Sequence, residues 1–223
     1  MRIWSVVSQK GGSGKTTLLV HLATAASAKG LAVSVIDLDP QRSAEQWAEL
    51  REDKLRKDEP AVVHGDTLSL DGMLAAARET GTDLVLIDTP PAIDKSMIYA
   101  AAAADVVLLP TRTAYFDRLA LAETLDYLKR IGALSKTLVI VNAPLKDEAA
   151  RAEVNRIAST NYGVTVLAHT LDENAALAKS LESGKGIVEA QPKGKPARAL
   201  LEIYKTISEI DAAKAASNTR RSA

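Results

Sequence analysis

The stretch Ser8–Thr17, SQKGGSGKTT, limits the fold more than any other part of the sequence. Gly11, Gly12 and Gly14 lie between a short apolar run and a long helical pattern. In this context, the backbone N–H groups of a glycine-rich turn and the positive end of the following helix can surround the oxygens of a polyphosphate. The stretch therefore predicts a strand, a phosphate-binding loop and a helix in direct succession.

The side chains of this loop have separate predicted roles. Lys15 would reach the β- and γ-phosphates of a nucleotide, and the Thr16 hydroxyl would ligate Mg²⁺. Ser13 belongs to the predicted loop, and Thr17 is a further donor in the first turn of the helix. Lys10 stands directly before the first glycine and needs a second explanation, because the loop chemistry requires only one lysine.

Apolar runs alternate with helical patterns along the chain, which is typical of βα units and a mostly parallel sheet. We expect an α/β, doubly wound P-loop NTPase fold with about seven strands and helices on both faces. The expected strands cover Ile3–Ser8, Ala32–Asp37, Ala61–His64, Asp83–Asp88, Asp105–Pro110, Lys136–Asn142 and Val164–Ala168. The first helix is expected over Thr16–Lys29 with Gly30 after it, and Ser43 and Gln46 resemble a capping box that opens the next helix.

The chain is the size of one domain, since its 223 residues are 47% hydrophobic and can form a single sizeable core. We expect this domain over residues 1–211 and a flexible tail over 212–223. The last helix is expected to pack through an apolar stripe of Leu200, Leu201, Ile203, Tyr204 and Ile207. The mixed-sign run REDKLRKDEP (51–60) is interpreted as a solvated helix end and loop.

Composition excludes several kinds of site. Basic and acidic residues number 28 each, so only a local patch would attract nucleic acid or anionic lipid. The lack of cysteine excludes disulfides, thiolate nucleophiles and cysteine-bound iron–sulfur clusters, and it fits the cytosol. No apolar stretch reaches the roughly 18 residues of a membrane span. We therefore expect no membrane attachment.

Three aspartates follow apolar strands and are candidate site residues. In the stretch DLVLIDTPP (83–91), Asp88 follows four apolar residues, as a Walker B carboxylate does, and can position the metal of a phosphate loop. In the stretch VSVIDLDPQ (33–41), Asp37 is expected at the carboxyl end of its strand and Asp39 just beyond it. This is the sheet edge where doubly wound folds bind ligands. Asp39 alone could equally begin a turn, because Asp-Pro is a common turn opening. Its occurrence beside the loop and Asp88 favours a role in the site.

Together, KGGSGKTT (10–17), VIDLDPQ (35–41) and LIDTPP (86–91) resemble the ParA/MinD family of deviant Walker A ATPases over nearly the whole chain. The resemblance implies ATP and Mg²⁺ as ligands and a homodimer when ATP is bound. It assigns Lys10 a contact with the phosphates of the opposite subunit's nucleotide. It also makes Asp39 the residue that positions or deprotonates the attacking water. The resemblance implies a metal site of Thr16, Asp88 and Asp37, in which Thr16 is the direct Mg²⁺ ligand and Asp37 is a carboxylate on the Mg²⁺ side or one that supports the ligands.

Two further stretches fit the same resemblance. Pro110 and Asp117 match a loop of the family that carries a proline and, seven residues after it, an aspartate. Asn142, in VIVNAP (139–144), would contact the adenine base, since a side-chain amide can both donate and accept hydrogen bonds. By itself an Asn-Ala-Pro turn is ordinary structure. The position after the sixth expected strand favours the base contact.

The sequence resembles the ParA branch more than MinD, because DPQ follows the second strand and no large apolar residue follows Ile210 to form a membrane helix. The resemblance implies a small, single-domain, cytoplasmic and nucleoid-associated ParA protein that binds DNA without sequence preference as an ATP dimer. A ParB-like or other adaptor protein would stimulate its hydrolysis. Plasmid DNA is the expected cargo, while chromosomes, carboxysomes, chemosensory clusters and conjugation machinery remain open.

A DNA-contacting surface is expected near the C-terminus, where residues 193–221 hold seven basic and three acidic side chains. The candidates are Lys193, Lys195, Arg198 and Lys205. An ordinary solvated helix face explains the same residues equally well.

Two other functions fit parts of the sequence. The main alternative is a metabolic ATP-dependent enzyme of the dethiobiotin synthetase type, which would need an acceptor pocket, and a purely structural interaction domain would leave the phosphate loop unexplained. The histidines, His21, His64 and His169, are interpreted as structural. Trp4 and Trp47 are expected to pack in the core rather than stack on bases.

Overall fold

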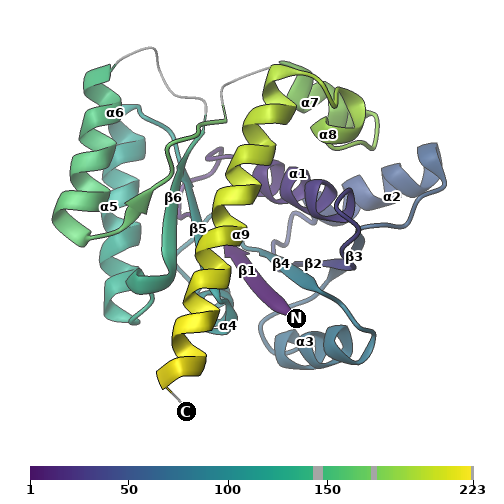
Figure 1. Cartoon of the computed structure of the whole chain (residues 1–223), viewed down its shortest axis with the longest axis horizontal. Coiled ribbons are helices and arrows are strands. Elements are labelled where there is room, and N and C mark those ends of the chain that lie inside the picture. Colours follow the sequence, from purple (N-terminus) through teal and green to yellow (C-terminus); the bar gives the residue numbers. More distant parts are fainter. Residues whose placement is uncertain (143–147, 172–174, 222–223) are drawn as a thin grey trace.

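A parallel sheet forms the centre of the computed structural model in Figure 1, in which residues 1–142, 148–171 and 175–221 are described. Its seven strands follow the order β3-β2-β4-β1-β5-β6-β7. Every neighbouring pair is parallel, so all strands end at the same edge of the sheet. The predicted α/β fold is confirmed, and β1 takes the central place.

The strand bounds agree with the sequence expectations to within two residues at each end. The strands are β1 (Arg2–Val6), β2 (Val33–Asp37), β3 (Ala61–His64), β4 (Leu84–Asp88), β5 (Val106–Thr111), β6 (Thr137–Val141) and β7 (Thr165–Val166). The central strands β1, β4, β5 and β6 are almost wholly buried, because helices cover both faces of a parallel sheet.

Helices connect the strands and follow the last one. They are α1 (Lys15–Ser27), α2 (Ser43–Leu55), α3 (Leu70–Glu79), α4 (Lys95–Ala103), α5 (Tyr115–Arg130), α6 (Glu148–Asn155), α7 (Ala175–Glu182), α8 (Ile187–Ala190) and α9 (Lys195–Arg221). A 3₁₀ turn covers Leu134–Lys136, and a π-helical segment, Arg156–Asn161, continues α6. None of the described helices is both long and apolar enough to pass through a bilayer.

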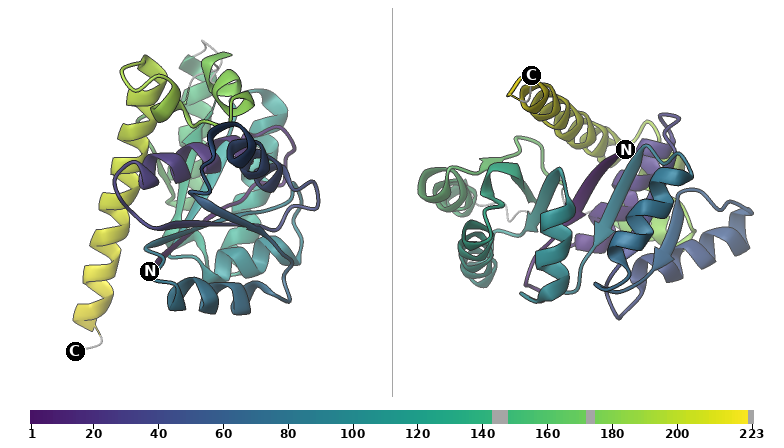
Figure 2. Two further views of the ribbon diagram at one scale, coloured as in Figure 1. Left: turned by 90° about the vertical axis from the view of Figure 1, so that its right-hand side faces the viewer. Right: turned by 90° about the horizontal axis from the view of Figure 1, so that it is seen from below.

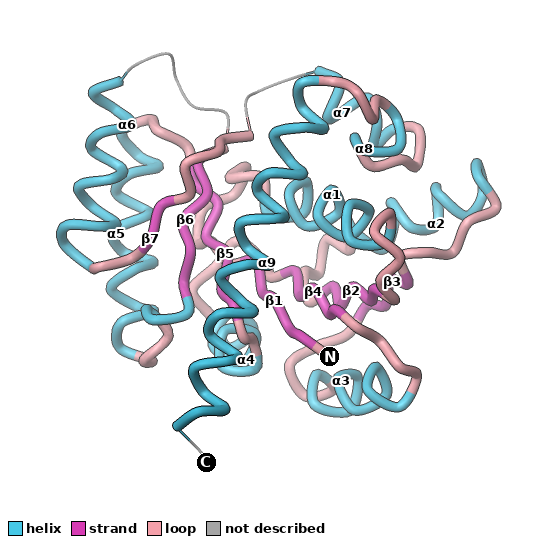
Figure 3. Tube along the Cα trace, viewed as in Figure 1, coloured by secondary structure: helices cyan, strands magenta, loops and turns pink. Residues whose placement is uncertain are grey.

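The helices form two layers, one on each face of the sheet, as Figures 2 and 3 show. One core cluster joins the sheet to α1, α2, α7, α8 and α9. The other joins it to α3, α4, α5 and α6. Trp4 and Trp47 are both buried in the first cluster, as expected for packing residues.

Helix α9 is longer than the sequence indicated. We expected helical order to end near Ile210, but α9 continues to Arg221, because the alanine-rich stretch after Ile210 has high helix propensity. The predicted stripe is largely correct: Leu200, Ile203 and Ile207 are fully buried, each of them stabilising the fold by about 1.5–3 kcal/mol. Beyond this stripe, Asp211 is buried and accepts hydrogen bonds from Arg2 and from Trp4 Nε1.

A close seam joins α1 to α8. The backbone N–H of Ile187 donates to His21 Nδ1 at 3.1 Å, and His21 is completely buried. A Cβ atom at Gly186 would lie 1.8 Å from Thr24 Oγ1, so only glycine allows α8 to approach this closely. Burial lowers the pKa of His21 to about 4, which keeps the imidazole neutral near neutral pH and supports its structural interpretation.

We expect His21 to make the fold less stable in mild acid. The folded pKa lies below the ordinary value of 6.5, so the unfolded chain binds more protons between these values and stability falls as pH falls. The loss between about pH 7 and about pH 5 should be about 2 kcal/mol. Urea denaturation of the wild type and His21→Gln at both pH values measures it. Equal pH dependence of the two proteins would contradict the prediction, because all other titrating groups are common to both.

Candidate nucleotide-binding site

The predicted site residues meet at the carboxyl edge of the three neighbouring strands β2, β4 and β1. The register places Asp37 beside Asp88, and Asp88 beside Val6, the last residue of β1. The loop of residues 8–14 follows β1 directly and leads into α1 at Lys15. The sheet topology thus brings the acids of two strands to the glycine-rich loop of a third.

Two glycines of the loop adopt the backbone conformation that glycine favours. Gly12 has φ +75° and Gly14 has φ +87°, both in the left-handed region. Gly14 also precedes the first residue of α1, so the free N–H groups of the helix begin at the loop. This is the backbone arrangement that the sequence predicted for a phosphate cradle.

Thr16 and Asp88 are directly paired. Thr16 Oγ1 donates to Asp88 Oδ2 at 2.6 Å. Burial raises the pKa of Asp88 to about 7; the Thr16 hydrogen bond counteracts this rise, and repulsion by Asp37 adds to it. Burial also lowers the pKa of Lys15, while Asp88 and Asp39 oppose the shift. Lys15 and the carboxylates of the predicted site are therefore close enough to interact electrostatically.

Asp37 has a structural role that the sequence did not reveal. Its carboxylate accepts backbone hydrogen bonds from Asp39 at 3.0 Å, and from Ala44 and Glu45, at 3.0 and 3.3 Å, in the first turn of α2. The expected capping box at Ser43 is wrong: Ser43 is the first helical residue, and the N-cap residue Arg42 makes no side-chain cap bond. The helix is capped by Asp37 at the end of β2 instead, since a carboxylate satisfies free N–H groups well.

Asp39 lies two residues beyond the end of β2 and is buried. Its Oδ1 accepts the backbone N–H of Gln41 at 2.9 Å, which is an Asx turn. The sequence allowed Asp39 either to begin a turn or to belong to the site. The two roles are compatible, because the turn holds the Asp39 carboxylate at the same sheet edge as Asp88.

Asn142 contacts the phosphate loop itself. Its side chain is 6% exposed, and Nδ2 donates to the carbonyl oxygen of Ser13 at 3.0 Å. A Cβ atom at Gly14 would lie 2.8 Å from the same Nδ2, so glycine is needed here for space as well as conformation. Asn142 Oδ1 and Ser13 Oγ are buried without hydrogen-bond partners among the described residues. Residues 143–144, the rest of the predicted base-contacting turn, lie outside the described residues.

Lys10 is held by a residue far away in the sequence. Its Nζ lies 2.5 Å from Asp117 Oδ1 in the first turn of α5. Next to it, Gln9 Nε2 donates to the carbonyl oxygen of Ala120 and to Glu123, at 3.3 and 2.5 Å. The sequence singled out Lys10 and Asp117 separately and missed their pairing, because no local pattern links residues 107 positions apart.

The residues present fit a magnesium nucleotide. A hydroxyl and a carboxylate already lie at hydrogen-bonding distance in Thr16 and Asp88, the oxygen ligand types that Mg²⁺ prefers. A cation there would relieve the repulsion among Asp37, Asp39 and Asp88 that contributes to the raised pKa of Asp88. No group of three or more acidic or histidine side chains among the described residues forms a complete metal cage by itself. Mg²⁺ commonly takes its remaining ligands from phosphate and water.

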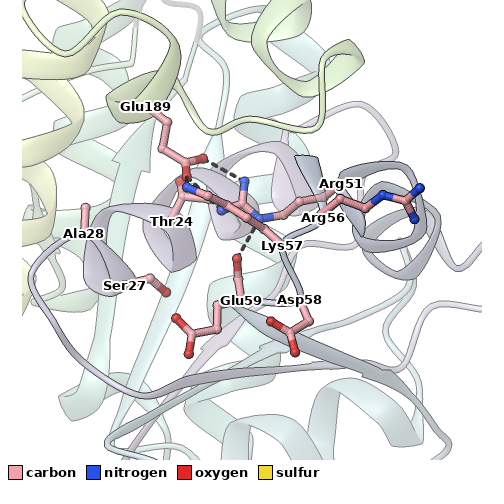
Figure 4. Close-up of a pocket in the computed structure, with 9 residues that line it drawn as sticks. All are labelled: Thr24, Ser27, Ala28, Arg51, Arg56, Lys57, Asp58, Glu59 and Glu189. Atoms are coloured by element: carbon pink, nitrogen blue, oxygen red, sulfur yellow. Dashed lines mark hydrogen bonds and ion pairs between the residues drawn. The ribbon is translucent and has the colours of Figure 1, made fainter. Parts of the chain in front are cut away.

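A pocket of about 440 Å³ lies elsewhere, between α1, α2 and α8 (Figure 4). Residues 51–60 were interpreted as a solvated helix end and loop, and Arg51 is the exception, since it is buried there and paired with Glu189 at 2.7 and 2.8 Å. Arg51 also donates to the carbonyl oxygens of Glu59 and Gly184. The remaining charged side chains of the run are exposed, as expected. This pocket contains none of the predicted site residues.

Three of the four candidate DNA-contacting residues lie at the start of α9 or just before it, and Lys205 lies further along the helix. Lys193, Lys195, Arg198 and Lys205 are all exposed. Lys205 is partly neutralised, because its Nζ lies 4.0 Å from Glu209 one turn further on. The three basic residues nearest the helix start thus form the strongest positive surface of this group.

Comparisons with known proteins agree with this geometry. The sequence model of the CobQ/CobB/MinD/ParA nucleotide binding domain matches residues 4–187. The chain belongs to this family. It is 31% identical over 214 residues to the maintenance of carboxysome distribution protein A of Gloeobacter kilaueensis, with 93% of each chain covered.

A second curated protein and a solved structure are also similar to this chain. The chromosome-partitioning ATPase Soj of Thermus thermophilus is 28% identical, with 92% of this chain and 93% of Soj covered. The MinD cell division protein of Aquifex aeolicus superimposes with a TM-score of 0.75 at 19% identity, over 94% of this chain and 98% of MinD, which shows the fold alone. A nucleotide-binding P-loop domain is therefore established for this chain.

We expect Asn142→Ala to weaken nucleotide binding. Loss of the bond to Ser13 frees the phosphate loop, and a lost buried hydrogen bond of about 1–1.5 kcal/mol corresponds to a roughly tenfold higher Kd. Calorimetric titration with a non-hydrolysable ATP analogue and Mg²⁺ measures it. Ser34→Ala is the matched control, since it removes one side-chain hydrogen bond, to Thr82 at 3.0 Å, near the start of β2. A Kd within about twofold of wild type for Asn142→Ala would contradict the prediction.

Proposed function

We propose that this chain is an ATP-dependent dimerisation switch: a weak ATPase that binds DNA without sequence preference as an ATP dimer and positions a cargo. The observation that carries the proposal is the meeting of the glycine loop, Lys15, Thr16 and Asp88 at one sheet edge, with Lys10 beside them. The names of the relatives support cargo positioning in general, since they refer to carboxysome distribution and chromosome partitioning. Plasmid DNA is the specific cargo that we propose.

In this proposal the chain's own residues carry hydrolysis. Lys15 and the N–H groups at the start of α1 hold the triphosphate, and Thr16 and Asp88 would hold Mg²⁺, which would neutralise charge on the transferred phosphoryl group. Asp39 orients the water that attacks the γ-phosphorus as the bond to the bridging oxygen breaks. Asn142 fixes the loop through Ser13, and its free Oδ1 is available to accept from the adenine amino group.

Lys10 is the residue that we propose couples dimerisation to hydrolysis. A cation contributed by the second subunit stabilises charge that develops on the phosphoryl group, as an arginine finger does. The pair with Asp117 is half exposed on the lysine side, so it stabilises the monomer by at most about 1 kcal/mol. A triphosphate offers a stronger set of charges, so Lys10 can exchange one partner for the other.

The proposed dimer would act with DNA and with an adaptor. Lys193, Lys195 and Arg198 are exposed at the start of α9 and can contact phosphates, and Lys205 adds a weaker charge. A ParB-like or other adaptor protein would stimulate hydrolysis and release the dimer. In a cell, we propose, this cycle places the protein on the nucleoid.

DNA association should require ATP. We expect binding of a duplex of arbitrary sequence with Mg²⁺ and a non-hydrolysable ATP analogue, and little binding with ADP, measured by fluorescence anisotropy. Affinity should also fall steeply with salt, because Lys and Arg contacts release counterions from the DNA. Equal binding with both nucleotides would contradict the switch. Replacement of Lys193, Lys195 and Arg198 by alanine should abolish binding, while replacement of the exposed Lys29, Lys129 and Arg130 by alanine removes the same charge elsewhere and serves as the control.

The two lysines of the loop should differ in their effects. Lys15→Ala should abolish nucleotide binding, since Lys15 lies in the buried part of the site. Lys10→Ala should leave the nucleotide Kd within about threefold and abolish both dimerisation and hydrolysis. Calorimetry and light scattering with the ATP analogue separate the two results. A Lys10→Ala protein that still dimerises and hydrolyses ATP would remove Lys10 from the mechanism.

A further inference from the structure

An apolar patch is exposed on the first two turns of α5. Tyr115, Phe116 and Leu119 are 60%, 71% and 46% exposed, and we call these three residues the α5 patch. Large aromatic side chains so open to water are unusual on a monomer and are typical of interface anchors.

The α5 patch is held in a fixed arrangement. The rings of Tyr115 and Phe116 pack edge to face with centroids 5.3 Å apart. The guanidinium of Arg118 lies over the Tyr115 ring, 6.0 Å from its centroid, and donates to the carbonyl oxygen of Thr113 at 2.6 Å. An ordered aromatic surface loses little conformational entropy when it binds a partner.

The same helix turn is attached to the phosphate loop. Asp117, between Phe116 and Arg118, holds Lys10, and Ala120 accepts a hydrogen bond from Gln9. The α5 patch therefore lies next to the phosphate loop, on the side where Lys10 is proposed to exchange Asp117 for a second copy's nucleotide.

We propose that the α5 patch is the apolar part of the contact between two copies of this chain in the ATP-bound dimer. This inference rests on the proposed function, because Lys10 can reach a second copy's nucleotide only if the surface around Lys10 faces that copy. Two-fold symmetry places the same patch on both sides of such a contact.

Charge complementarity supports a second copy as the occupant. Beside the α5 patch stand Lys10, Arg118 and Arg112, and the Arg112 side chain is exposed and forms no ion pair with the described residues. The nucleotide site of a second copy offers the opposite charge through the triphosphate that it binds in the proposed function. Apolar anchors beside opposite charges are the usual composition of a specific interface.

Phe116→Asp tests the proposal. Light scattering after size exclusion, with Mg²⁺ and a non-hydrolysable ATP analogue, should give a dimer for wild type and a dimer Kd at least about tenfold higher for Phe116→Asp. Leu119→Asp should show the same loss, and Phe116→Tyr should retain the dimer. Leu68→Asp is the matched control, because Leu68 is 93% exposed and follows β3, three strands away from β1.

The Kd for ADP with Mg²⁺, measured by calorimetry, should be within about twofold of wild type in all four variants, because ADP does not drive dimerisation in this proposal. A Phe116→Asp protein that dimerises like wild type would overturn this inference and leave the proposed function standing, even if adaptor stimulation were lost. A changed Kd for ADP would overturn it as well, since the patch would then act on its own subunit's site. A wild-type protein that stays monomeric with the analogue would overturn the proposed function and this inference together.

Discussion

The parallel pairing of β1 with β4, and of β4 with β2, determines where the functional side chains lie. Parallel strands end at one edge, so Asp37, Asp88 and the loop after Val6 meet although they come from separate parts of the sequence. Burial at this edge is what gives the carboxylates their raised pKa values. The same low-dielectric surroundings make a phosphate and a cation effective partners there. The geometry and the chemistry of the site thus follow from one topological fact.

Much of this arrangement could be predicted from the sequence. Buried strands leave apolar runs, and a glycine loop between strand and helix leaves a fixed spacing, so the sheet and the loop around Lys15 were correctly placed. The contact of Asn142 with Ser13 could not be predicted, because it depends on β6 lying two strands away from β1 in the folded sheet. Strand order is a property of the assembled sheet and leaves little trace in local patterns.

The wrong expectations have a common cause. Ser43 was expected to cap α2, but Asp37 at the end of β2 lies closer to the free N–H groups and replaces it. Arg51 belongs to a run of mixed charge, and only the approach of α8 makes it a buried partner of Glu189. In both cases, a tertiary contact decides the role of a side chain that a local rule had assigned.

The seam at Gly186 has a mechanical consequence. Helix α1 begins at the phosphate loop, and α8 lies against its other half with no room for even a methyl group between Gly186 and Thr24. Because α9 follows α8 after a short turn, a tilt of α1 cannot be absorbed at this joint. The contact therefore couples the position of the C-terminal helices rigidly to that of the helix that begins at the phosphate loop.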